Sequence, residues 1–216
     1  MKRFLLTVAM ALALAPVLFS QTQAVVKEFK GKVEIKAGGG EWQPVTAGMK
    51  LDTGASISTG FSSTALLDLG TSTLKVAPLT RMQLVELIAR QGSVSTTLAL
   101  KVGRVNADVK TAPGLRQDFT VKGPHATAAV RGTEFEFDGV SVKVINGLVF
   151  FSNNQGQGRG VGAGEQSSTS GTQIPTSGDQ ENESNTSVEP YTSTGGTALP
   201  PSAVPPAPAT VTIRWE

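Results

Sequence analysis

The residues around Asp52 are the first in this chain whose types and spacing could support catalysis. Leu51-Asp52-Thr53-Gly54 has the residue order found around the catalytic carboxylate of aspartic proteases. That chemistry needs two such carboxylates sharing one proton, one from each lobe or each subunit. No second Asp-Thr-Gly or Asp-Ser-Gly occurs in the sequence. A protease using Asp52 would therefore have to be a homodimer, and we keep it only as the less favoured alternative.

The sequence contains few of the residues that other kinds of catalytic or metal-binding site need. His125 is the single histidine and follows Gly123-Pro124 in a turn, with no nucleophile elbow elsewhere to pair with it. Cysteine is absent, which excludes thiol catalysis and disulfides and leaves no metal-ligand set. Gly38-Gly39-Gly40 lacks the Gly-Lys-Ser/Thr ending of a phosphate loop and is typical of a hairpin tip. We expect no cofactor, no metal and no enzymatic activity.

The start of the chain predicts export. Met1-Lys2-Arg3 precedes an apolar run over 4–19, and Thr22-Gln23-Ala24 resembles a small-residue cleavage site. The run is shorter than the ~20 residues that span a bilayer, so we interpret 1–24 as a cleaved signal peptide. No later apolar run has that length, so no further membrane-spanning segment is expected. The protein should be periplasmic or extracellular.

Charge and composition divide the remaining chain. Residues 25–160 carry 16 Lys and Arg against 11 Asp and Glu, whereas 161–216 carry one Arg and six acids. Both signs are scattered, which argues against a nucleic-acid partner. Residues 167–210 are rich in Ser, Thr, Gly, Asn, Gln and Pro, which predicts a disordered tail. The alternation in 211–216 is typical of a short strand, so the globular domain should cover 25–166.

Short β-branched and apolar runs, separated by Gly, Pro, Asn or Asp, make up that domain. They cover residues 32–36, 55–59, 64–69, 73–77, 82–88, 94–109, 119–122 and 126–152. Only 81–90 has a pattern that a helix could share. Strands of this length with turn signals between them predict an all-β fold, either an antiparallel sandwich, a barrel or a short solenoid.

Two turn dipeptides, Asp138-Gly139 and Asn146-Gly147, predict consecutive hairpins with type I′ turns. The expected opposite pairs are Phe137 with Val140, Phe135 with Val142, Thr133 with Val144, Val144 with Val149, Val142 with Phe151, and Glu134 with Lys143. The apolar members of these pairs form one face.

Ile145, Leu148 and Phe150 would lie on the other face of these hairpins. We expect a second sheet to cover that face. The alternative is that it is exposed and forms a candidate binding face.

Gly132 separates two stretches of opposite phase. Ala126, Ala128 and Val130 alternate on even numbers, and the phenylalanines that follow alternate on odd ones. A β-bulge at Gly132 would account for the change. Arg131 would then satisfy nearby carbonyls or reach a carboxylate such as Glu134, and ligand contact by Arg131 is the alternative.

The segment around this glycine resembles the a-x-V-R-G-T-x-F signature of the FecR family. The signature positions are Val130, Arg131, Gly132, Thr133, Glu134 and Phe135. Residues 48–60 resemble an early family element, with Gly48, Leu51, Gly54, Ile57 and Thr59 in place, and residues 162–165 resemble a closing Gly-Glu element. The resemblance spans about 26–166. It departs from the family in two turns, at Gly70-Thr71 and Asn146-Gly147.

The resemblance implies an extracytoplasmic all-β domain, of the kind found in iron-uptake regulators that receive a signal from an outer-membrane receptor. Those regulators also have a cytoplasmic helical segment and a membrane helix, which this sequence does not show. We therefore expect a non-enzymatic interaction or ligand-sensing module of the cell envelope. A component of an iron-uptake type signalling system is the alternative. The expected partner is an envelope or outer-membrane protein, or a glycan.

Overall fold

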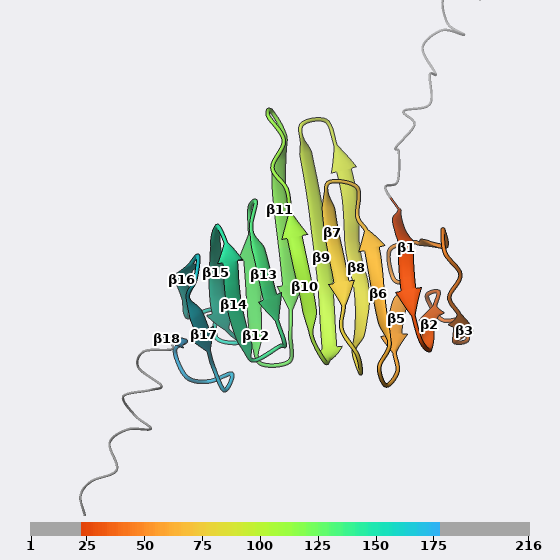
Figure 1. The fold of residues 1–216 in the computed structure, drawn as a ribbon. Helices are drawn as coiled ribbons and strands as arrows, with labels where there is room; N and C mark the ends of the chain where they lie inside the picture. Colours follow the sequence, from red (N-terminus) through yellow and green to blue (C-terminus); the bar gives the residue numbers. More distant parts are fainter. Residues whose placement is uncertain (1–22, 178–216) are drawn as a thin grey trace, which may run out of the picture.

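The computed structural model describes residues 23–177, and every regular element within them is a β-strand (Figure 1). Two nine-stranded sheets form a sandwich, which confirms the all-β prediction. Most of the predicted signal peptide, and residues 178–216 with most of the predicted tail and its strand-like end, lie outside the described residues. Residues 23–177 contain no helix with the length and apolarity needed to cross a membrane.

The two sheets are named A and B. Sheet A has the order β18 (Thr176–Ser177), β17 (Gln166–Ser168), β14 (Ser141–Asn146), β13 (Glu134–Phe137), β10 (Val105–Val109), β7 (Ser72–Val76), β6 (Thr64–Asp68), β1 (Ala24–Lys30) and β4 (Lys50–Leu51). Sheet B has the order β16 (Gly158–Gly162), β15 (Leu148–Asn153), β12 (Ala126–Val130), β11 (Arg116–Lys122), β9 (Ser93–Val102), β8 (Arg81–Arg90), β5 (Ser56–Thr59), β2 (Val33–Lys36) and β3 (Gln43–Pro44).

The core lies between the sheets because successive side chains along a strand alternate between the two faces. Phe119 and Phe135 meet edge to face with ring centroids 6.3 Å apart, and Phe137 meets Phe151 at 6.4 Å. All four rings are fully buried, and burial of a phenylalanine contributes about 1.5–3 kcal/mol. In a chain without cysteine, this apolar core stabilises the fold.

Hairpins within one sheet alternate with crossings to the other. In the part of the chain from β5 to β10, the crossings at 60–63, 77–80 and 103–104 lie at one edge of the sandwich, which is the lower edge in Figure 1. After β10 the crossings at 110–115, 131–133, 147 and 163–165 lie at the upper edge. β10 lies between two crossings and so forms no hairpin. The strands before and after it in the chain, β9 and β11, pair in parallel in sheet B. All other strand pairs that the structure describes are antiparallel.

Residues 81–90 form a strand, β8, as the run over 82–88 predicted, and not the helix whose pattern 81–90 could share. The predicted register of the first hairpin is wrong. Asp138-Gly139 belongs to a longer turn, so Phe137 pairs with Val142 and not with Val140. Because this slip is two residues, each side chain stays on its predicted face while its partner changes.

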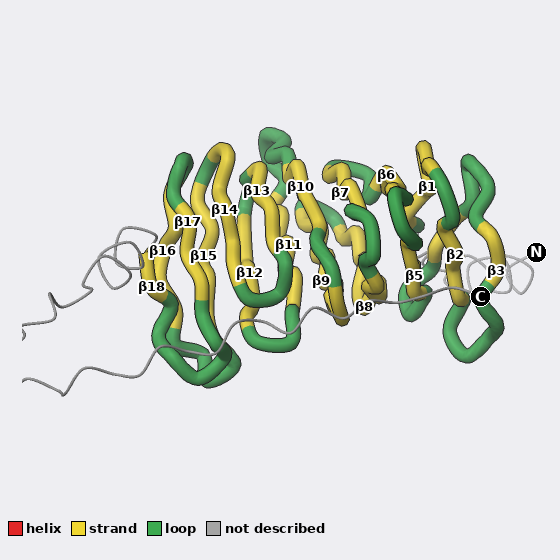
Figure 2. The backbone as a smooth tube through the Cα atoms, turned by 60° about the horizontal axis from the view of Figure 1, so that its bottom comes forward, coloured by secondary structure: helices red, strands yellow, loops and turns green. Residues whose placement is uncertain are grey.

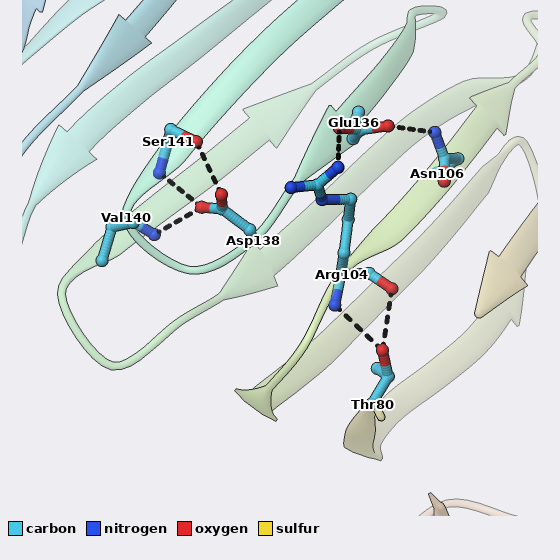
Figure 3. Close-up of polar contacts among 7 residues, drawn as sticks. All are labelled: Thr80, Arg104, Asn106, Glu136, Asp138, Val140 and Ser141. Carbon is cyan, nitrogen blue, oxygen red and sulfur yellow. Dashed lines mark hydrogen bonds and ion pairs between the residues drawn. The ribbon is translucent and has the colours of Figure 1, made fainter. Parts of the chain in front are cut away.

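The same slip also changes the remaining pairs of that hairpin. Phe135 pairs with Val144, and Glu136, not Glu134, pairs with Lys143. The Asp138 side chain fixes the longer turn, since its carboxylate accepts hydrogen bonds from Val140 N (3.1 Å), Ser141 N (2.7 Å) and Ser141 Oγ (2.8 Å) (Figure 3).

Asn146-Gly147 does not form the second predicted hairpin. β14 lies in sheet A and β15 in sheet B, so this dipeptide makes a crossing. Val144 and Val142 therefore do not pair with Val149 and Phe151. Their side chains still meet the same core, but from the opposite layer.

A hydroxyl-stabilised corner recurs at three crossings. A buried Ser or Thr hydroxyl accepts the N–H of the residue that follows a glycine with positive φ: Ser63 for Lys32 (2.9 Å), Thr80 for Arg104 (2.9 Å) and Thr133 for Leu148 (3.3 Å). Thr80 Oγ1 also donates to the carbonyl of Arg104, as Figure 3 shows. These side chains replace backbone hydrogen bonds where the chain leaves a sheet.

The ordered region extends beyond the predicted boundary at Gln166. β17 pairs with β14, and β18 pairs with β17. Ser167 Oγ donates to the carbonyl of Thr176 (2.6 Å), and Thr169 N donates to that of Val140 (2.9 Å). The strands at 166–168 and 176–177 thus extend sheet A, and hydrogen bonds from polar side chains hold them and the loop between them in place.

Candidate functional site

The family signature forms the crossing between β12 and β13. Val130 and Phe135 point into the core on either side, and Gly132 has φ of 71°. A Cβ at Gly132 would overlap the methyl group of Thr111. The predicted β-bulge is therefore a crossing between sheets, and glycine is needed there both for its φ and for the close approach.

Thr133 joins this crossing to the next one. Its hydroxyl donates to the carbonyl of Leu148 (2.9 Å) and accepts the Leu148 N–H (3.3 Å), and its own carbonyl accepts Val109 N (3.0 Å). Three neighbouring segments are thereby fixed around one buried side chain. Most signature residues thus hold the fold together.

The Arg131 side chain is exposed, unlike those of Val130, Thr133 and Phe135. Its Nε lies 2.8 Å from Asp118 Oδ1, and Arg116 Nε lies 3.0 Å from Asp118 Oδ2. The predicted partner Glu134 is not the one used, since Glu134 projects from the opposite sheet. One carboxylate thus orients two guanidinium groups, that of Arg116 on β11 and that of Arg131 just after β12, and both arginine side chains remain largely exposed.

The electrostatics of Asp118 agree with this arrangement. Partial burial raises the pKa of its carboxyl, but hydrogen bonds from Arg116 and Arg131, together with their charges, outweigh burial and hold the pKa below its ordinary value. The carboxylate therefore stays ionised and keeps Arg131 in place at neutral pH.

A shallow hollow of about 350 Å³ lies beside Arg131 on the outer face of sheet B. Asp118, Thr120, Ala129 and Arg131 form its polar and small-residue part, and Leu148 and Phe150 form its apolar wall. The walls come from three adjacent strands, since Thr120 pairs with Ala129 and Ala129 pairs with Phe150. Cation and apolar surface therefore adjoin.

The candidate binding face differs from the prediction both in its residues and in its exposure. Leu148 is 63% exposed, Phe150 is 53% exposed and Ile145 is 50% exposed, so the expectation of a covering sheet is wrong. Leu148 and Phe150 lie on sheet B, whereas Ile145 lies on sheet A, because 147 is a crossing. Phe150 instead lies beside Gly158 of the edge strand β16, where a Cβ would come within 2.8 Å of the ring.

Sequence reasoning missed Asp118 and Arg116. Their alternation with Gln117 and Phe119 placed both on one face of a strand, but the pairing of β11 with β12 was needed to bring Asp118 to Arg131. Trp42 was missed as well, and the guanidinium carbon of Arg81 lies 5.3 Å from its ring centroid.

The residues considered for catalysis lie apart. Asp52 sits in the exposed turn before β5, where its Oδ1 accepts a hydrogen bond from Gln23 Nε2 (2.6 Å). His125 occupies the β11–β12 turn, and its backbone N–H donates to Gly139 O (3.3 Å). Within residues 23–177, no three His, Cys, Asp or Glu side chains gather in a way that could hold a metal.

Comparison with known proteins identifies one family. The FecR protein family model matches residues 55–150, which include the signature and Ile57-Ser58-Thr59 of the early element, but not residues 162–165. A search of the curated proteins finds no match.

Solved structures were compared as well. Two crystal structures of a candidate anti-sigma factor from Parabacteroides distasonis ATCC 8503, at 1.65 and 2.50 Å resolution, are 17% identical to this chain with a TM-score of 0.46. Each similarity covers 56% of this chain and 58% of that chain, so this chain spans less than two thirds of their length. The chain thus contains a FecR domain, which the family model places at residues 55–150 and whose signature forms the crossing at Gly132.

Proposed function

We propose that this protein is an exported, non-enzymatic interaction module of the cell envelope, and that it docks an envelope protein or glycan at the hollow beside Arg131. The match of residues 55–150 to the FecR family model supports a signalling-related role. The sequence pattern over 1–24 supports export. The outer face of sheet B supplies the docking surface.

The observation that carries the proposal is the exposure of Arg131, which borders the hollow while Val130, Thr133 and Phe135 of the signature are buried. Asp118 holds the guanidinium in one orientation, which lowers the entropy that would be lost on binding. Leu148 and Phe150 add exposed apolar surface next to it. Arginine beside aromatic surface is a frequent composition at the centre of interaction sites.

The carboxylates support binding in preference to catalysis. The pKa values of Asp68 and Asp118 are both lowered, and ion pairs with Lys27 and with two arginines respectively are among the causes. Neither of these two carboxyls has the raised pKa that a general acid at neutral pH needs.

Site-specific photo-crosslinking in exporting cells tests the proposal. A photoreactive phenylalanine analogue at position 150 should give an adduct of defined mass, which mass spectrometry identifies as protein or glycan. The matched control replaces Phe29, which is 41% exposed and lies on β1 of sheet A, away from the hollow. Arg131→Ala should abolish the adduct at 150 without changing the melting temperature. Equal adducts at both positions, or an adduct that survives Arg131→Ala, would contradict the proposal.

A further inference from the structure

Three large apolar side chains project from adjacent crossings at the lower edge of the sandwich. Phe61 is 84% exposed, Val102 is 59% exposed and Leu79 is 50% exposed. The crossings are neighbours, because Leu79 N donates to Gly60 O (3.2 Å) and the Thr80 hydroxyl binds the backbone of Arg104. Figure 2 brings this edge forward and shows the loops side by side. We call Phe61, Leu79 and Val102 the lower-edge row.

Backbone strain accompanies two of these tips. Leu79 has φ of 54° and Ser62 has φ of 48°, and no other non-glycine residue in 23–177 has a positive φ. A leucine rarely adopts this conformation, since its side chain crowds the backbone. Burial does not explain it, because the side chain faces solvent. The Pro78-Leu79 turn thus holds this apolar side chain at the exposed tip of the crossing.

The chain segments that carry the row contain cations and no acidic residues. The segments 30–33, 59–64, 76–81 and 101–105 contain no Asp or Glu, and their cations are Lys30, Lys32, Arg81, Lys101 and Arg104. Glu34 and Glu136 approach from the adjoining strands and pair with Lys32 (3.4 Å) and Arg104 (2.9 Å). Lys30 and Lys101 add exposed positive charge at either side of the row.

From these observations we propose that the lower-edge row inserts into the surface of an anionic lipid bilayer. Apolar tips flanked by lysine and arginine have the composition of interfacial membrane-binding segments. A deformable bilayer accommodates separate projecting side chains, whereas a protein partner would need a matched pocket for each of them. With this edge on the membrane, the hollow beside Arg131 near the upper edge stays free. The proposal concerns a different surface from the docking hollow and does not depend on it.

Vesicle binding by the full chain tests this inference. The protein should co-sediment with phosphatidylcholine vesicles that contain phosphatidylglycerol, and less with phosphatidylcholine alone. The double variant Phe61→Ser, Leu79→Asn should lower the partition coefficient by roughly tenfold or more, because two apolar side chains are lost. Asparagine tolerates positive φ, so folding should be retained. Phe150→Ser is the matched control and should bind as the parent protein does.

A labelled cysteine reports on the row itself, since the chain has no cysteine of its own. An environment-sensitive fluorophore on Val102→Cys should shift to the blue on anionic vesicles, and the same fluorophore on Leu148→Cys at the upper edge should not. Lys101→Gln should weaken binding by about fivefold at low salt. Absence of binding, equal binding to neutral vesicles, equal shifts at both labels, or capture of a protein through this row without vesicle binding would each overturn the proposal.

Discussion

Replacement of Thr133 by valine isolates the energy of the hydroxyl corner at the family signature. Valine keeps the shape of the side chain and removes only the hydroxyl, which makes two hydrogen bonds to Leu148. Each such bond contributes about 1 kcal/mol, and a buried group that loses its partner costs about 1–3 kcal/mol. We therefore expect a loss of about 2 kcal/mol in the free energy of unfolding.

The loss should be visible as a change in melting temperature. For a domain of this size, 1 kcal/mol corresponds to roughly 2–4 °C, so the melting temperature should fall by about 4–8 °C. Urea unfolding and calorimetry measure the two quantities independently. Thr80→Val should behave in the same way, because Thr80 binds Arg104 through the same pair of contacts.

Thr120→Val is the matched control. It is the same substitution at a half-exposed position on the outer face of sheet B, and it should change stability by less than about 0.5 kcal/mol. If Thr133→Val were no more destabilising than Thr120→Val, the hydroxyl corner would not contribute to stability, and the signature threonine would need another explanation.

Three further predictions address the signature and the hollow. Gly132→Val should cost about 1–3 kcal/mol or more in thermal unfolding, because of its positive φ and the overlap with a neighbouring methyl group, and an unchanged melting temperature would refute this. Phe150→Glu should leave folding intact, whereas Phe151→Glu should unfold the domain by placing an unpaired charge in the core, and circular dichroism would show whether the two variants differ. Since its folded pKa is lowered, Asp118 contributes stability above its unfolded pKa and loses it as the pH falls through the folded pKa. Asp118→Asn should therefore reduce the loss of stability on acidification, by less than about 1 kcal/mol because the pair is exposed. Urea midpoints measured at neutral pH and at a pH below the folded pKa of Asp118 test this. An equal fall of the midpoint in the parent protein and in Asp118→Asn would contradict it.

The sequence predicts the strands well because alternation is a local signal. It places Phe135 and Phe137 on a buried face and identifies Gly132 as the position where the phase changes. It cannot tell a bulge from a crossing, since both are one-residue changes of phase. For the same reason, the sequence predicts a hairpin at Asn146-Gly147 and places Ile145 on one sheet with Leu148 and Phe150.

The geometry around Arg131 required the structure. Its partner Asp118 is 13 residues away, and its apolar neighbours Leu148 and Phe150 reach it only because β12 lies between β11 and β15. The hydroxyl corners had a weak sequence signal in Gly31-Lys32-Val33, Gly103-Arg104-Val105 and Gly147-Leu148-Val149. Their spacing is irregular, so no repeat is apparent until the crossings are seen.

Alternation of short hairpins and crossings keeps strand pairing short-range, and this has a consequence for how the domain unfolds. Among the strands of residues 23–177, the most widely separated ladder partners are Val25 and Asp68, 43 positions apart. Each strand therefore touches only its near neighbours along the chain, as in a quasi-one-dimensional repeat array. Such arrays fray from their ends and propagate order from any stable nucleus, which suits a polypeptide that emerges one end first during synthesis.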